Sequence, residues 1–257
     1  MTDIDPTEVE VRDAATVMLV RDAAAGPEVF LLQRNPANVF VGGAYVFPGG
    51  AVDPEDRNTG LEAFCAGLTD REASSALGLD RGGLAFWVAA IRECFEECGI
   101  LLAYDRDGRP LRVDDPPVAE RFADHRRRVD RGEVLLADVC AAEGLTLATD
   151  TLGFVSRWIT PEGPPRRYDT RFFVAPAPAG QIGRHDGREA VADVWLRPAD
   201  AIARAAVGEL ALIEPTIANL DTIARFDSTD EVLAGAPEPS PIRIPLPGEP
   251  GFEGAAS

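Results

Sequence analysis

Two apolar, β-branched blocks, Ala14–Val20 and Val29–Leu32, flank a stretch rich in turn-forming residues, Arg21–Pro27. Blocks of this kind, bounded by turn signals, are typical of β-strands, and the pair predicts two strands joined by a turn. The same reasoning predicts further strands at residues 44–47, 100–104, 154–160, 170–175 and 190–196.

The clearest helix in the chain is predicted over Leu84–Cys98, which follows Gly82-Gly83 and is stopped by Gly99. Other helical patterns cover residues 59–77 (one helix or two), 116–142, 198–207 and 215–226, and Ser228 is placed to cap a short last helix. Strands interleaved with helices indicate a layered α/β or α+β domain.

The helix at 84–98 has two different faces. Glu93, Glu96 and Glu97 are related by three or four positions, so they project from one side. Apolar residues follow the same spacing on the other side and predict a core-facing stripe: Ile91, Cys94, Phe95 and Cys98.

Three carboxylates this close repel one another, and a hard divalent cation relieves the repulsion. Oxygen-only ligands favour Mg²⁺ or Mn²⁺ over zinc. Such an ion can activate water and neutralise phosphate oxygens, and Arg92 can pair with Glu96 one turn later. The alternative is an acidic helix face that is merely solvated.

Composition narrows the choice of partners. Hydrophobic residues make up 46% of the 257 residues, enough for a sizeable core, and the net charge is −18. Every basic side chain among the 25 is an arginine. An acidic surface repels polyphosphate, so we expect no nucleic acid polymer as partner, while a small anionic ligand remains compatible with a local cationic pocket or a metal.

The chain has four scattered cysteines, no apolar run of about 20 residues and an acidic start without an apolar segment. These features predict a cytoplasmic protein that does not insert into a membrane.

Residues 92–100 read Arg-Glu-Cys-Phe-Glu-Glu-Cys-Gly-Ile, and Phe47-Pro48-Gly49-Gly50 form a glycine turn upstream. Together they resemble the Nudix box, whose second half is R-E-U-x-E-E-x-G-U with U apolar. The resemblance implies an α/β/α sandwich around a mixed β-sheet over residues 12–235, and hydrolysis of a nucleoside diphosphate linked to another moiety. It also implies metal ligation by Glu93, Glu96, Glu97 and the carbonyl of Gly49 or Gly50, with Arg92 orienting a carboxylate.

The first half of the box departs from the family pattern. Its glutamate position, six residues after Gly50, holds Asp56, and a long insertion separates Asp56 from Arg92. Either the insertion brings Asp56 back to the site or the first acid is absent. A long insertion within the box resembles the subgroup that includes coenzyme A diphosphatases. Arg34 fits the upstream coenzyme A signature of that subgroup, whereas Val39 stands where an arginine is expected.

Other site residues are weaker candidates. Arg166, Arg167 and Tyr168 precede a predicted strand and either contact substrate phosphate or form an ordinary surface loop. Glu189 is the candidate for a further acid from a loop, as metal ligand or base. We expect His125 and the adjacent Arg126–Arg128 run to be solvated.

Around the domain we expect a leader at residues 1–11, helical insertions at about 57–83 and 106–148, and an extended Pro/Gly-rich tail at 236–257. The insertions and the tail provide surfaces for a homodimer.

The leading hypothesis is therefore a Mg²⁺- or Mn²⁺-dependent diphosphohydrolase for a small nucleotide-like substrate, with coenzyme A or acyl-coenzyme A as the favoured one. Glu93 or Glu96 accepts the proton of the attacking water, and the sequence does not decide which. The competing hypothesis is a Nudix-fold module that binds a nucleotide without cleaving it.

Overall fold

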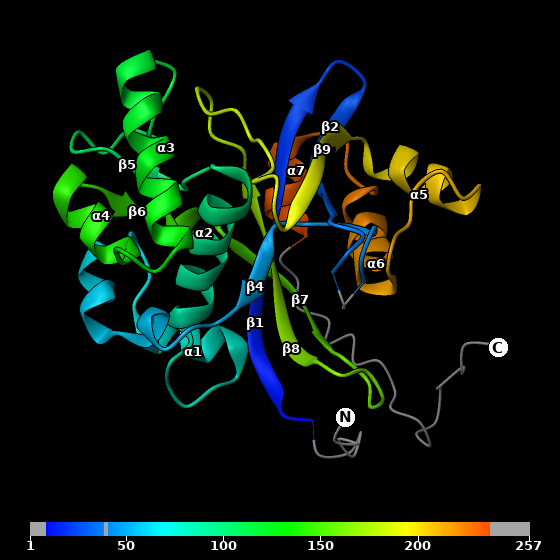
Figure 1. Cartoon of the computed structure of the whole chain (residues 1–257), viewed down its shortest axis with the longest axis horizontal. Coiled ribbons are helices and arrows are strands. Elements are labelled where there is room, and N and C mark those ends of the chain that lie inside the picture. Colours follow the sequence, from blue (N-terminus) through cyan, green and yellow to red (C-terminus); the bar gives the residue numbers. More distant parts are fainter. Residues whose placement is uncertain (1–8, 39–40, 237–257) are drawn as a thin grey trace.

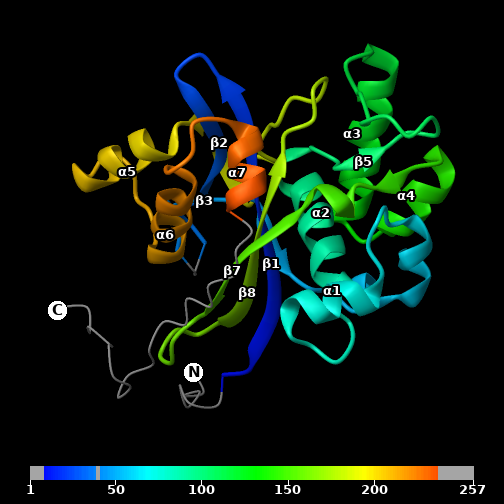
Figure 2. The ribbon, with the colours of Figure 1, turned by 180° about the vertical axis from the view of Figure 1, so that it is seen from behind.

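The computed structural model describes residues 9–38 and 41–236. A seven-stranded mixed sheet lies between two groups of helices (Figures 1 and 2). One group contains α1 to α4, and the other contains α5, α6 and α7. The predicted α/β/α sandwich around a mixed sheet is confirmed. The predicted leader lies largely, and the predicted tail almost wholly, outside the described residues, as does Val39.

The central strand β1 (Val11–Ala23) organises the sheet. It pairs in parallel with β8 along ten residues and antiparallel with two different strands, β2 near its end and β4 near its start. The remaining strands are added outside these, with β7 beside β8, and with β3 and β9 beside β2. Their bounds are β2 Gly26–Arg34, β3 Tyr45–Val46, β4 Gly49–Ala51, β7 Gly153–Ile159, β8 Arg167–Pro176 and β9 Ala190–Leu196.

The two helical layers explain why β1 is apolar without a break. Successive side chains of a strand point to opposite faces, and both faces of this sheet are covered. Val17 and Leu19 belong to the core beneath α2, whereas Met18 and Val20 belong to the core beneath α5 (Pro198–Ala206), α6 (Glu214–Ile223) and α7 (Thr229–Gly235).

Helix α2 (Leu84–Cys98) has the bounds that the sequence predicts. Gly99 ends it in the left-handed conformation, with φ of 75°, and its N–H donates to the carbonyl of Phe95. Nearly the whole helix is buried, because β1 and β4 cover one side and the insertions cover the other.

Both regions predicted as helical insertions contain helices that pack around α2. The first holds the 3₁₀ helices η2 (Glu55–Arg57) and η3 (Thr59–Phe64), followed by α1 (Asp70–Leu77). The second holds α3 (Pro116–Asp130) and α4 (Leu136–Glu143). These helices lie between two short strands that pair with each other, β5 (Ala103–Tyr104) and β6 (Thr146–Leu147). The 3₁₀ helix η4 (Thr149–Thr151) follows.

Several local predictions were wrong. Gly49-Gly50 form a strand rather than a turn, because β4 pairs with the first half of β1. Residues 116–142 form two helices, since Gly132 takes φ of 65° between α3 and α4. Arg167–Asp169 belong to β8 rather than to the preceding loop, because they continue its ladder with β1. Residues 100–102 precede β5 as buried, non-strand chain.

Within the two described ranges, no helix combines the length and apolarity needed to cross a membrane.

Candidate functional site

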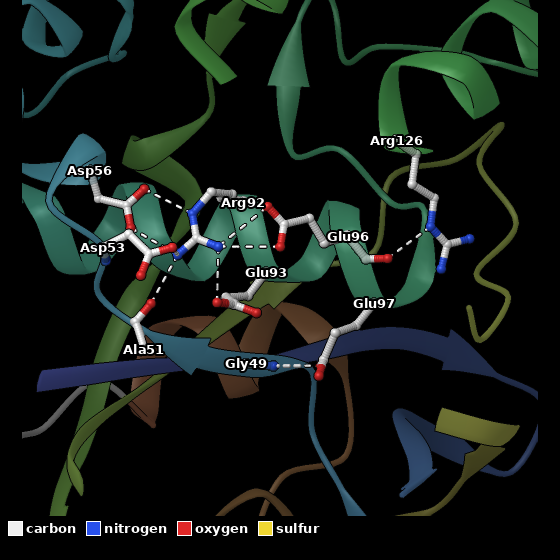
Figure 3. Close-up of polar contacts among 9 residues, drawn as sticks. All are labelled: Gly49, Ala51, Asp53, Asp56, Arg92, Glu93, Glu96, Glu97 and Arg126. Atoms are coloured by element: carbon white, nitrogen blue, oxygen red, sulfur yellow. Dashed lines mark hydrogen bonds and ion pairs between the residues drawn. The ribbon is translucent and has the colours of Figure 1, made fainter. Parts of the chain in front are cut away.

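The candidate site lies where strand β4 runs along helix α2 (Figure 3). Backbone groups alternate in direction along a strand edge. The carbonyl of Pro48 and the N–H of Val52 make hydrogen bonds to β1, so the backbone groups of Gly49 and Ala51 point toward α2. The N–H of Gly49 donates to Glu97 Oε2 over 2.9 Å, and the carbonyl of Ala51 accepts from Arg92 Nη2 over 2.8 Å. Because of the same alternation, the carbonyl of Gly49 also points toward α2.

The glycine pair permits this close approach. A Cβ atom on Gly50 would lie 2.5 Å from Glu93 Oε1, and one on Gly49 would overlap Thr16 and the backbone of β1. A side chain at Gly49 would therefore force β4 away from β1, and one at Gly50 would displace the carboxylate of Glu93.

Arg92 joins the two halves of the motif. Its Nε and Nη2 donate to the two carboxylate oxygens of Asp56 over 3.0 and 2.9 Å, a bidentate pair across 36 positions of sequence. Its Nη1 donates to Glu93 over 2.9 Å and reaches Glu96 at 3.3 Å. The insertion therefore folds back so that Asp56 reaches the site, where it pairs with Arg92, the next charged residue of the box pattern.

The carboxylates of α2 are buried rather than solvated. Glu97 is 8% exposed, and the side chains of Glu93 and Glu96 are 14% and 17% exposed. The alternative hypothesis of a merely solvated acidic face is therefore wrong for this helix. Glu93 and Glu97 lie one helical turn apart and both face β4 (Figure 3).

Burial and mutual repulsion raise the pKa values of this cluster. Burial raises the pKa of Glu93 to about 8, against the opposing effect of Arg92 and with a further increase from Glu96. Burial and the charge of Glu93 raise the pKa of Glu97 well above its usual range, although the Gly49 N–H opposes this. Burial also raises the pKa of Glu96, and Arg92 opposes that rise.

The donor set fits a hard divalent cation. Glu93, Glu97 and the Gly49 carbonyl offer only oxygen, and a cation beside them would offset the repulsion that raises both pKa values. In residues 9–38 and 41–236 no three Asp, Glu, His or Cys side chains converge tightly enough to hold an ion without rearrangement. Arg92 instead takes up Glu93 and Glu96, so their side chains must rotate to bind a metal.

Arg34 and Glu189 join the site from the far end of β2. Arg34 is the last residue of β2 and pairs with Ala190 of β9, next to Glu189. The charge of Arg34 lowers the pKa of Glu97 and that of Glu189 raises it, which places both near Glu97. The Nε of Arg34 is buried and has no hydrogen-bond partner in residues 9–38 and 41–236.

The structure does not bring Arg166, Arg167 and Tyr168 to the glutamates. Arg167 pairs with Val11 and Gly49 pairs with Thr16, five residues farther along β1, which corresponds to about 17 Å of strand. Arg167 is buried, and its Nε donates to the carbonyl of Thr160. The site proposed below therefore uses Arg34 and not these three residues.

Arg126 also reaches α2, which its sequence context did not indicate. Its Nε donates over 2.9 Å to the carbonyl of Glu96, near the end of α2 (Figure 3), and its Nη2 is buried with no hydrogen-bond partner among the described residues. The prediction of a solvated arginine run is wrong for this residue. It is also wrong for His125, whose Nε2 lies 3.0 Å from Glu143. No signal in the chain revealed either contact, because both depend on how α3 packs.

Comparison with known proteins agrees with this geometry. Residues 11–223 match the family model described as the NUDT19 Nudix domain. The acyl-coenzyme A diphosphatase NUDT19 of Gallus gallus is 30% identical over 86% of this chain and 70% of its own length. The human protein of the same name is 29% identical over 81% of this chain, and the match spans 64% of the human protein.

A solved structure supports the fold. The NUDIX hydrolase from Alicyclobacillus acidocaldarius is 28% identical, with a TM-score of 0.72 over 88% of this chain and 97% of that one. The family match covers most of the chain, and the structure assembles both halves of the box around Arg92. The chain therefore belongs to the Nudix hydrolase family, in the branch of the NUDT19 Nudix domain.

Proposed function

We propose that the protein hydrolyses the diphosphate of coenzyme A or acyl-coenzyme A in a reaction that requires Mg²⁺ or Mn²⁺. The observation that carries the proposal is the buried excess of carboxylates, Glu93 and Glu97, against the Gly49-Gly50 edge of β4. The names of the chicken and human relatives support the substrate. The match spans about two thirds of those relatives, so their activity is a proposal for this chain.

The metal would be held by Glu93, Glu96, Glu97 and the carbonyl of Gly49, with Glu189 as a further acid. It would neutralise the diphosphate oxygens and lower the pKa of the attacking water. Arg92 orients the carboxylates of Glu93 and Glu96, and Asp56 holds its guanidinium in place. Arg34 supplies a cation for a phosphate oxygen.

Glu93 or Glu96 accepts the proton of the attacking water. Variants of Glu93 and Glu96 separate the role of general base from the role of metal ligand. Replacing either residue by glutamine removes a proposed ligand and should weaken Mn²⁺ binding in calorimetry, and the variant whose kcat stays low at saturating Mn²⁺ identifies the base.

A substrate screen tests the proposal. The purified protein would be incubated with Mg²⁺ or Mn²⁺ and coenzyme A, acyl-coenzyme A, NADH, ADP-ribose or nucleotide sugars, and products would be identified by mass spectrometry. We expect cleavage of coenzyme A or its thioesters into 3′,5′-ADP and a phosphopantetheine fragment, and no products with Glu97→Gln.

The alternative is a nucleotide-binding module, favoured by the aspartate at position 56, where the box has glutamate. Binding of coenzyme A without products, in the presence of either metal, would support that alternative and overturn the hydrolase.

Two further proposals concern the setting of the protein. Four cysteines that are free thiols support a reducing compartment such as the cytoplasm. A homodimer through the helical insertions is the second, and sedimentation velocity tests it.

A further inference from the structure

A cavity of about 220 Å³ lies beside Arg92 and Glu96, on the side of α2 away from β4. The residues around η2 form one wall, which carries the carboxylates of Asp53, Glu55 and Asp56. The end of α3, the start of α4 and the segment between them, here called the α3–α4 segment, form the other wall, which is mostly apolar: Val129, Val134, Leu135, Leu136 and Ala137. The two insertions thus enclose a space that opens from the candidate reaction centre.

The size of the cavity indicates that it holds part of a ligand. Pockets that accept a whole small molecule usually have volumes of about 300–1,000 Å³. A cavity of 220 Å³ has room for about seven waters at the volume of liquid water. It therefore suits one group that is attached to the reacting diphosphate.

The charges of the lining exclude an anionic group. Four carboxylates, of Asp53, Glu55, Asp56 and Glu96, face one guanidinium, that of Arg92. Arg92 already donates to Asp56, Glu93 and Glu96, so it has little capacity left for a phosphate. Carboxylates accept hydrogen bonds, and the opposite wall is aliphatic. The cavity therefore suits an uncharged chain with methylene groups and N–H or O–H donors.

Cations lie near the last turn of α2. Within the described part of the chain, Arg34 Nε and Arg126 Nη2 are both buried without a hydrogen-bond partner; Arg34 lies near Glu97, and Arg126 donates to the carbonyl of Glu96. Guanidinium groups with unused donors bind phosphate. A substrate with an anionic and a neutral end would thus have one orientation between these arginines and the cavity.

We infer that the cavity between η2 and the α3–α4 segment binds the neutral, amide- and hydroxyl-bearing arm of the substrate, while Arg34 and Arg126 bind its phosphorylated nucleoside. The inference rests on the proposed function, since it assigns an orientation to the diphosphate substrate. Val134 and Ala137 are then specificity-determining residues supplied by the second insertion.

Filling the cavity tests the inference. Ala137→Trp and, as a second variant, Val134→Trp place an indole in the cavity, and both positions are half-buried rather than in the core. Ala141→Trp is the matched control, because Ala141 lies on the same helix, is exposed and does not line the cavity. Circular dichroism would verify the fold of all three.

Two probes separate the arm from the nucleotide. We expect the filling variants to raise the KM for coenzyme A at least tenfold. They should leave the inhibition constant of adenosine 3′-phosphate 5′-diphosphate, which has no arm, within twofold of wild type. The control should change neither value. Equal changes for both compounds, or none for coenzyme A, would overturn the inference.

Free pantetheine provides a readout that does not require turnover. Saturation-transfer NMR should detect it on the wild-type protein and on Ala141→Trp, and not on Ala137→Trp. A signal that persists in the filled variants would place the arm elsewhere. If wild-type protein cleaves no coenzyme A, the proposed function fails, and the pantetheine signal still decides whether the cavity accepts this arm.

Discussion

Two charged clusters with buried members lie against the same sheet, and they differ in balance. At the start of β8, Asp169 lies between Arg157 and Arg171, and Arg171 also reaches Asp13. Positive and negative groups alternate there, and the buried Asp169 and Arg171 pair with each other and with the more exposed Arg157 and Asp13. On α2, a single arginine serves several carboxylates, and within the described residues Glu97 accepts a hydrogen bond only from the amide of Gly49.

The difference separates structural charges from functional ones. A balanced cluster finds partners for its charges within the chain, and its loss should reduce stability. An acid-rich cluster is unfavourable by itself and is expected to require a cation, as perturbed groups at functional sites often do. Arg167, part of the segment that looked like a phosphate site in the sequence, lies two residues before Asp169 and donates instead to the carbonyl of Thr160.

The largest expected effect is on catalysis at the acid-rich cluster. Glu97→Gln should lower kcat by at least about 100-fold, because even residues that only support metal ligands account for 10–100-fold effects. The same variant should melt at a higher temperature than wild type in metal-free buffer, since it removes a buried repulsive charge. Steady-state kinetics and calorimetry measure the two quantities. A drop in both activity and melting temperature would mean that Glu97 supports the fold.

The balanced cluster should give the opposite result. Asp169→Asn leaves the buried Arg171, which is 3% exposed, without its principal partner and should destabilise the protein by about 3 kcal/mol. At temperatures well below melting, kcat should remain within threefold of wild type. Urea denaturation and kinetics check this prediction. A large loss of kcat in folded protein would show that the segment takes part in the reaction.

Asp56 lies between the two cases, because it pairs with an arginine and also touches the acidic site. Asp56→Asn removes the charge of the bidentate partner of Arg92 and should lower kcat 10–100-fold with a small change in KM. Asp56→Glu keeps the charge and restores the residue type of the family box, so it should recover part of the activity. If both variants match wild type, Asp56 has no positioning role.

The smallest effect concerns the loop that carries Glu189. Burial alone would raise the pKa of Asp186, but N–H groups of Glu189 and Ala190 donate to it over 2.9 Å each and lower the pKa below the ordinary 3.8. Its contribution to stability is therefore present above pH 3.8 and is lost as the pH falls through the lower folded-state value. Asp186→Asn should cost less than about 1 kcal/mol at pH 7, because solvent screens the carboxylate.

Urea denaturation at pH 7 and at pH 3 measures this difference. The gap between wild type and Asp186→Asn should narrow at the lower pH. A gap that widens on acidification would contradict the direction of the shift.

Local patterns predicted much of this molecule. The bounds of α2, the Ser228 cap of α7 and the strands β1, β2 and β9 follow from apolar periodicity and from capping residues, which act within a few positions. The shared face of Glu93, Glu96 and Glu97 follows from helical geometry alone. The resemblance to the Nudix box, counted from Gly50, also identified Asp56 as a candidate.

Long-range packing decided the remainder. That Gly49-Gly50 form a strand depends on β1 offering them a free edge, and the contact of Asp56 with Arg92 depends on how the insertion folds back. The burial of Arg126 and the apolar wall of the cavity arise only when α3 and α4 cover α2. These features join residues far apart in sequence, and no local periodicity records which buried charges will find a partner.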